Sequence, residues 1–141
     1  MNHKILTLAI AASLGLALLP VRADDAKLDP SKLPPASTAT GVTYAKDIKP
    51  IFDNSCTKCH SGEKAKSKLH LDSLEGALKG GKNAPDIIAG KSGQSPLVYA
   101  VAHVGDDDDD FMPPLKNKAN IGPLTPEQVG LIRAWIDQGA K

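Results

Sequence analysis

"CTKCH", residues 56–60, is the stretch that decides how this chain folds. It holds both cysteines of the 141-residue sequence, and a histidine follows the second one directly. This C-x-x-C-H spacing is typical of covalent haem attachment. Two thiols three positions apart on one helical turn each add to a vinyl group of the same haem, and the adjacent histidine then faces the iron. The motif therefore predicts one covalent haem c, bound by Cys56 and Cys59, with His60 as the proximal iron ligand.

Other sites with this cysteine spacing fit the sequence less well. A redox-active C-x-x-C pair usually follows a strand of a β-α-β unit, whereas the preceding residues 42–55 have a helical pattern and no parallel-sheet pattern is visible. A zinc site needs four ligands, and the chain has no second C-x-x-C and no H-x-x-x-H. Haem attachment is therefore the preferred interpretation.

The N-terminus has the pattern of a secretory signal peptide. A basic start at Lys4 precedes an apolar run, and small residues follow up to Ala23. The run is short for a membrane span and no second one follows, so we expect no stable span after cleavage. We predict cleavage after residue 23 and export to the periplasm. Residues 24–41 are rich in Pro, Ser, Thr and Ala and are predicted to be a flexible leader.

The charge of the predicted mature chain is nearly balanced. Its 118 residues hold 15 basic and 16 acidic side chains. The basic residues are not gathered among aromatic ones, so nothing indicates nucleic-acid binding. The length suits a single domain, which we predict over residues 42–141.

Four stretches of that domain have the apolar spacing of helices. They cover residues 43–52, where Thr43 is the expected cap and Pro50 a kink, 73–79, 97–104 and 126–138. The chain is therefore predicted to be all-α.

Capping residues define where three of these helices should begin. Asp72 with Glu75 resembles a capping box, Ser95 precedes the third helix, and Thr125 with Gln128 is a capping box for the fourth. The expected core stripe of the last helix consists of Leu131, Ile132, Trp135 and Ile136.

Met112 is the best candidate for the second axial ligand of the iron. It lies 52 residues after His60, a separation at which the chain can return to the opposite haem face. Pro113 and Pro114 follow it and restrict the backbone, which suits the presentation of a thioether at a fixed depth. A gap-filling core role is the simpler alternative, because methionine often has it.

Two histidines compete with Met112. His103 follows the apolar stripe of the third helix by one position and is expected to be a polar surface or hydrogen-bonding residue. His70 lies between Leu69 and Leu71 and should point away from the face that these leucines bury.

The order of the motifs resembles the planctomycete-type cytochrome c domain. "CTKCH", "LDS", "ALKGG", "GKSGQSPL", "MPP" and the run from "LT" to "WIDQGA" occur between residues 44 and 140 in the family's order. The resemblance implies a small all-α, cytochrome c-like fold around one haem. It also implies thioether bonds at Cys56 and Cys59, His60 as proximal ligand and Met112 as distal ligand.

These inferences predict a soluble periplasmic one-electron carrier and not an enzyme. Iron with two axial protein ligands has no open position for a substrate, and a thioether favours the ferrous state. Two alternatives stay open. If Met112 is displaced, the haem could act as a small-ligand sensor or a weak peroxidase. The domain could instead dock to one larger redox enzyme and serve only that enzyme.

Five consecutive aspartates, Asp106 to Asp110, precede Phe111 and Met112. Such a run is often a solvated loop. A calcium loop is a weaker interpretation, because the spaced ligands and the glycine of an EF-hand are missing. The third interpretation is docking, in which acidic residues beside the methionine attract a basic redox partner.

Overall fold

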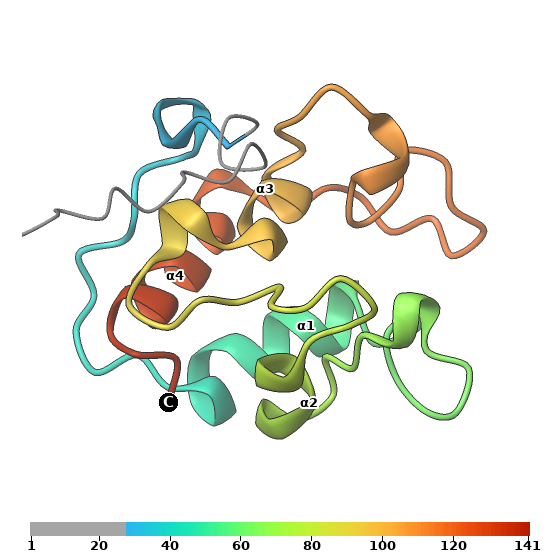
Figure 1. Ribbon diagram of the computed structural model, residues 1–141, viewed down its shortest axis with the longest axis horizontal. Coiled ribbons are helices and arrows are strands. Elements are labelled where there is room, and N and C mark those ends of the chain that lie inside the picture. Colours follow the sequence, from blue (N-terminus) through green and yellow to red (C-terminus); the bar gives the residue numbers. More distant parts are fainter. Residues whose placement is uncertain (1–27) are drawn as a thin grey trace, which may run out of the picture.

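The computed structural model describes residues 28–141, which form four α-helices joined by long loops and short helical turns (Figure 1). The helices are α1 (Lys49–Ser55), α2 (Leu74–Lys79), α3 (Pro96–Ala102) and α4 (Pro126–Asp137). No strand occurs between residues 28 and 141, and the predicted all-α fold is confirmed. None of the helices in this range is long and apolar enough to cross a membrane. The predicted signal peptide lies outside the described residues.

The core is built around α4. The predicted capping box is present: the Thr125 hydroxyl accepts from the Gln128 backbone N–H, and the Gln128 side chain accepts from the Thr125 N–H. Trp135 is fully buried and meets the ring of Phe52 edge-on at a centroid distance of 6.4 Å. The core stripe differs from the prediction at one position, since Leu131 is only half-buried. The buried residues of α4 are Val129, Gly130, Ile132, Ala134, Trp135 and Ile136.

Helix α1 extends the core and leads directly into the cysteine motif. Thr43 caps the chain as predicted, its hydroxyl accepting from the Lys46 N–H at 3.4 Å. Residues Tyr44–Ile48 form a short π-helix that continues into α1, and Pro50 stands in the first turn of α1. Since Phe52 is fully buried against α4, the end of α1 is fixed in space.

The start of α2 differs from the prediction. Ser73, not Asp72, is the N-cap, and its hydroxyl accepts from the Gly76 N–H at 3.1 Å. The extended backbone of Ser73 puts its short side chain next to the first free N–H groups of the helix. A capping residue one position earlier would therefore be too far from them.

Helix α3 begins at Pro96, after Ser95 as expected, but Ser95 makes no side-chain cap. Its buried hydroxyl instead accepts from the Ile88 N–H and donates to the Lys91 carbonyl, each at 2.9 Å. This serine therefore fastens the loop over residues 80–95 to the start of α3.

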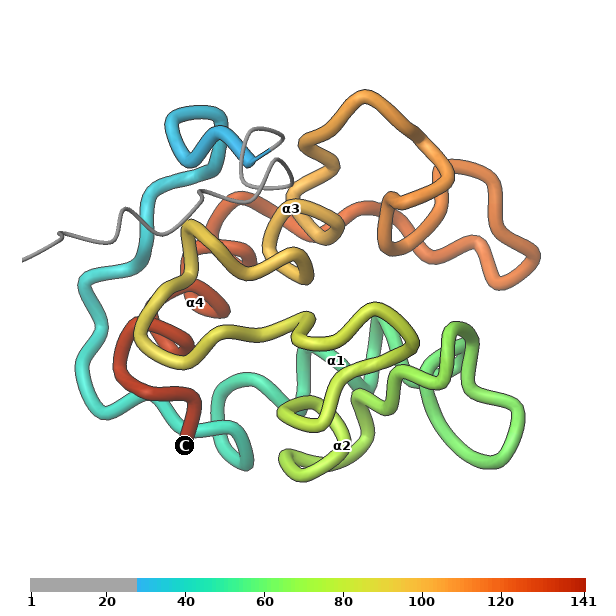
Figure 2. The backbone as a smooth tube through the Cα atoms, in the orientation of Figure 1, coloured from blue at the N-terminus to red at the C-terminus, as the bar shows by residue number. Residues whose placement is uncertain are grey.

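The segment before the first helix packs along α4 (Figure 2). Leu33 is buried, and the Ser37 N–H donates to the Gly130 carbonyl at 2.9 Å. A Cβ atom at Gly130 would lie 2.7 Å from the Pro35 carbonyl oxygen, so the close approach requires glycine. The expectation that residues 24–41 have little to bury fails at Leu33, which belongs to the hydrophobic core, whereas residues 34–41 are half-buried or exposed.

Candidate functional site

A cavity of about 590 Å³ brings Cys59, His60 and Met112 together. Residues 59–69 and 81–86 line part of it, and α3 with residues 104–114 lines the rest. In Figure 1 residues 59–69 belong to the green loop at the lower right, and residues 104–114 belong to the orange loop above it. His60 and Met112, which are 52 residues apart in sequence, thus contribute to one site.

The cysteine motif is a helical turn that continues from α1. The Cys56 N–H donates to the Phe52 carbonyl at 2.7 Å, and the Cys56 carbonyl accepts from the N–H groups of Cys59 and His60 at 3.0 and 2.9 Å. The Leu71 N–H donates to the His60 carbonyl at 2.8 Å. The two thiols therefore project from one turn, and backbone hydrogen bonds connect this turn to α1 before it and to Leu71 after it.

The two thiols differ in burial. Cys56 is buried, whereas Cys59 is half-buried and lines the cavity. Burial, with a smaller contribution from Cys59, raises the pKa of the Cys56 thiol to about 12. Reactive dithiols depend on a lowered pKa, so the Cys56 environment does not favour a thiol-disulfide redox centre. Nor does the described part of the chain contain a cluster of three or more His, Cys, Asp or Glu side chains that could hold a metal ion.

His60 is a half-buried histidine at the cavity. Burial is the main cause that lowers its pKa, and the backbone of Leu69 and Lys66 opposes the shift more weakly. The neutral ring is the form that binds metal ions. Its Nδ1 atom is buried without a hydrogen-bond partner, so the protein does not engage that nitrogen.

Met112 lines the cavity from the opposite segment. It is half-buried, packs against the hydrophobic core, and its backbone N–H donates to the Ala100 carbonyl at 3.0 Å. Phe111, directly before it, is buried and also lines the cavity. The peptide bond between Met112 and Pro113 is cis.

The rival histidines do not line the cavity. His70 is partly exposed between buried Leu69 and Leu71, in agreement with the sequence pattern. His103 contradicts its prediction, because it is not a polar surface residue. Its ring stacks on Phe111 at a centroid distance of 4.7 Å, and its buried Nε2 atom has no hydrogen-bond partner.

The aspartate run lies at the cavity. Asp108–Asp110 form a short helical turn, and the Asp107 carboxylate accepts from the Asp109 N–H at 2.9 Å. All five side chains are exposed, and every one of them except Asp108 lines the cavity. None of the ion pairs found in residues 28–141 involves this run. Its negative charge is therefore directed to solvent beside Met112.

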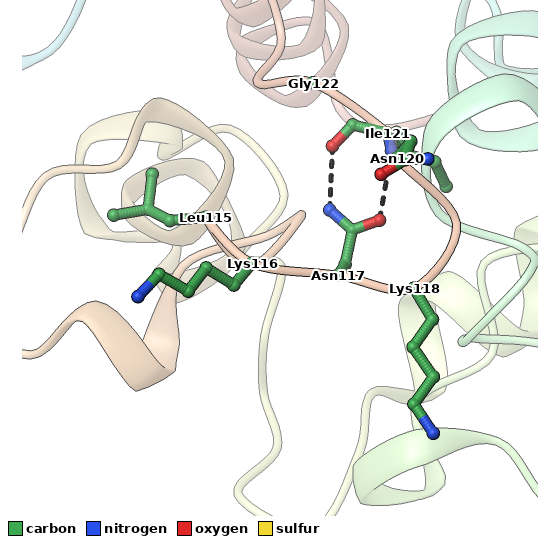
Figure 3. A pocket seen from close by; sticks show the side chains of 7 residues that line it. All are labelled: Leu115, Lys116, Asn117, Lys118, Asn120, Ile121 and Gly122. Carbon is green, nitrogen blue, oxygen red and sulfur yellow. Dashed lines mark hydrogen bonds between the residues drawn. The ribbon is translucent and has the colours of Figure 1, made fainter.

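A second hollow of about 640 Å³ is formed by the loop from Leu115 to Gly122 (Figure 3). The Asn117 side chain closes this loop, since its amide nitrogen donates to the Ile121 carbonyl at 2.8 Å and its oxygen accepts from the Ile121 N–H at 3.0 Å. The hollow is lined by lysine, asparagine, leucine, isoleucine and glycine, and it has no thiol, imidazole or thioether. The chemistry of this second hollow does not match the sequence motif.

Residues 56–116 match the model of the protein family described as "Planctomycete cytochrome C". The chain contains a planctomycete-type cytochrome c domain. The match begins at Cys56 and includes Met112. No curated protein and no solved structure matches the chain significantly. The cytochrome domain indicates a haem-bearing protein with a role in electron transfer.

The residues of the cytochrome domain fit a covalent haem. The cavity volume lies within the range of about 300 to 1,000 Å³ that is usual for small-molecule and cofactor sites. One thiol, one imidazole with a buried unpartnered nitrogen and one thioether meet there. Leu69, Leu97 and Val104 add apolar surface to the lining, which suits a large flat macrocycle, and charged residues such as Lys66 and Lys82 line the cavity as well.

Sequence reasoning missed several lining residues. Leu28 reaches the cavity from the segment before the first turn, and Tyr99 from α3 donates from its hydroxyl to the Gly93 carbonyl at 2.7 Å. Nothing in the sequence points to Leu28. Phe111 could have been predicted as a lining residue, because it is the direct neighbour of Met112, the candidate ligand, and so lies close to the same cavity.

Proposed function

We propose that this chain is a monohaem c-type cytochrome that carries single electrons in the periplasm. The observation that carries the proposal is the cavity lined by both the C-x-x-C-H turn and Met112. The family match supports the haem and the electron-transfer role. When bound, a c-type haem supplies one-electron chemistry between ferric and ferrous iron.

The proposed residue roles follow from the chemistry of the side chains. Cys56 and Cys59 form the two thioether bonds, His60 holds the iron from one face, and Met112 holds it from the other. The depressed pKa of His60 keeps its imidazole neutral and able to bind. The thioether of Met112 favours ferrous iron, and this raises the reduction potential relative to a histidine at the same position.

A carrier role also requires that the iron be closed to other ligands. With His60 and Met112 both bound, no coordination position is left for a substrate. Buried Phe111 and Leu69 give the cavity apolar surface beside His60 and Met112. Two axial protein ligands would favour electron transfer over sensing or peroxidase chemistry.

The predicted signal peptide over residues 1–23 supports the proposed periplasmic location. For the redox partner we propose a protein with a basic surface. Four exposed aspartates at the cavity would attract it to the Met112 side and shorten the path to the haem.

The proposal is tested on protein matured with haem, purified from a periplasmic fraction. Mass measurement after denaturation should give the chain from residue 24 plus one haem. The ferric protein should show the long-wavelength charge-transfer absorption of iron bound to a thioether, and ferrous protein should bind CO slowly.

The decisive variant is Met112→Ala. It should abolish that absorption, lower the reduction potential and speed CO binding, because one axial position is opened. Leu115→Ala is the matched control, since Leu115 is 59% exposed and does not line the cavity. An unchanged low-spin spectrum in Met112→Ala would sink the proposed ligation, and rapid CO binding by the unmodified protein would favour a sensor.

A further inference from the structure

His103 occupies a strained position at the end of α3. It is the C-cap of the helix and has a φ of 53°, in the left-handed region. This conformation is unfavourable for a residue with a Cβ atom, and helices that end in it usually have glycine there. Glycine would relieve this conformation, so His103 offers a site at which the ring can be removed without added backbone strain.

That side chain packs on Phe111 and not on the cavity. The two rings are almost parallel, with an interplanar angle of 11° and a centroid distance of 4.7 Å. Phe111 is buried and lines the cavity, whereas His103 does not. His103 thus lies behind Phe111 as seen from the cavity, and in this arrangement it is not an iron ligand.

The stack joins α3 to the segment that carries Met112. A second link is the hydrogen bond from the Met112 N–H to the Ala100 carbonyl at 3.0 Å. Residues 105–110, just before them, are exposed, and the Phe111 N–H donates to the Asp108 carbonyl at 3.2 Å within the same segment. The end of α3 therefore contributes to the position of the Met112 backbone.

We propose that His103 is a positioning residue, which holds the Phe111 ring and thereby sets the thioether of Met112 in the cavity. This inference rests on the proposed ligation by Met112. The hydrogen bond to the Ala100 carbonyl attaches the Met112 backbone to α3 at one point. The flat contact between the two rings attaches the neighbouring residue, Phe111, at a second point.

The test compares His103→Gly with His103→Phe in the haem-loaded protein. Glycine removes the ring and also relieves the left-handed backbone, so a loss of stability is not expected from strain. Loss of one aromatic contact should raise the rate of CO binding to ferrous protein about tenfold and weaken the thioether absorption. Phenylalanine restores a flat ring and should retain both properties of the unmodified protein.

Asn120→Gly is the matched control, because Asn120 is also left-handed, with a φ of 51°, and exposed. It should change neither readout. The inference is overturned if His103→Gly behaves like the unmodified protein, or if His103→Phe fails to restore the absorption in a folded protein. The second result would mean that the imidazole itself, and not a stacked ring, is required.

Met112→Ala separates this inference from the proposed function. If that variant keeps the thioether absorption, the ligation is wrong whatever His103 does. If it loses the absorption while His103→Gly keeps it, the ligation stands and only the role of His103 is wrong.

Discussion

The two halves of the cavity are built in different ways. On the His60 side, Cys56, Cys59 and His60 lie within five consecutive residues on a turn that continues α1. On the Met112 side, the candidate ligand lies in a segment with no α-helix between α3 and α4, next to five exposed aspartates. One half is organised by local backbone hydrogen bonds, and the other by a few contacts to the end of α3. We therefore expect the first half to retain the cofactor and the second to control its properties.

The largest effect should come from replacing both thiols. Cys56→Ser with Cys59→Ser removes the atoms that form thioether bonds, so the mature chain should lose the full mass of one haem after denaturation. Met112→Ala should keep that mass, because its side contributes no covalent bond. Covalent haem in the double serine variant, or loss of haem from Met112→Ala, would contradict the expectation that only the His60 half retains the haem.

Two phenylalanines give a matched test of stability. Phe52 is fully buried between Tyr44 and Trp135, and Phe52→Ala should lower the free energy of unfolding by about 3 to 5 kcal/mol. Phe111→Ala should cost less, because its ring is 8% exposed and lies at the cavity. Urea unfolding measures both changes.

The order should reverse for the thioether absorption. Phe111→Ala should weaken it strongly, whereas Phe52→Ala should leave it intact as long as the chain is folded. Equal effects of the two variants on both readouts would show that the halves are coupled and not separate.

A smaller effect is expected at Asn117, just after the Met112 segment. Its amide donates to the carbonyls of Pro114 and Ile121 and accepts from the Ile121 N–H. Asn117→Ala should cost about 1 to 3 kcal/mol and speed CO binding several-fold, since it loosens the loop that follows the ligand. Lys118→Ala is the control, because Lys118 is exposed on the same loop and makes no such bonds. Stability measured by urea unfolding should be unchanged in the control.

The contrast between local hydrogen bonds and contacts over long sequence distances also explains which features the sequence could predict. The capping box of Thr125, the helical pattern that ends at the cysteine motif and the ligand spacing from Cys56 to His60 are signals over three to five residues. Local hydrogen bonds determine them, and the structure has the first two as expected. The cap of α2 was placed one residue early because Asp72 and Ser73 are both good capping residues and only the backbone decides between them.

Features that depend on distant parts of the chain were missed. The packing of Leu33 and Pro35 on α4 requires Gly130, nearly one hundred residues later. The stack of His103 on Phe111 requires a loop to return to the end of α3. From the sequence we predicted a flexible leader around Leu33 and a polar residue at His103. Such predictions use the preferences of each residue type and do not include contacts with distant parts of the chain.

The smallest effect concerns the charge beside Met112. Asp106, Asp107 and Asp109 are exposed at the cavity, and changing all three to Asn should slow electron transfer with a basic redox partner several-fold at low salt. The difference should vanish at high salt, since at about 1 M the screening length is about 3 Å. Stopped-flow rates at several ionic strengths measure it. Asp72→Asn with Glu75→Gln is the control, because these exposed carboxylates lie near α2 and away from the cavity. If the control slows transfer as much as the triple variant, net charge is sufficient and the position of the run beside Met112 has no special role.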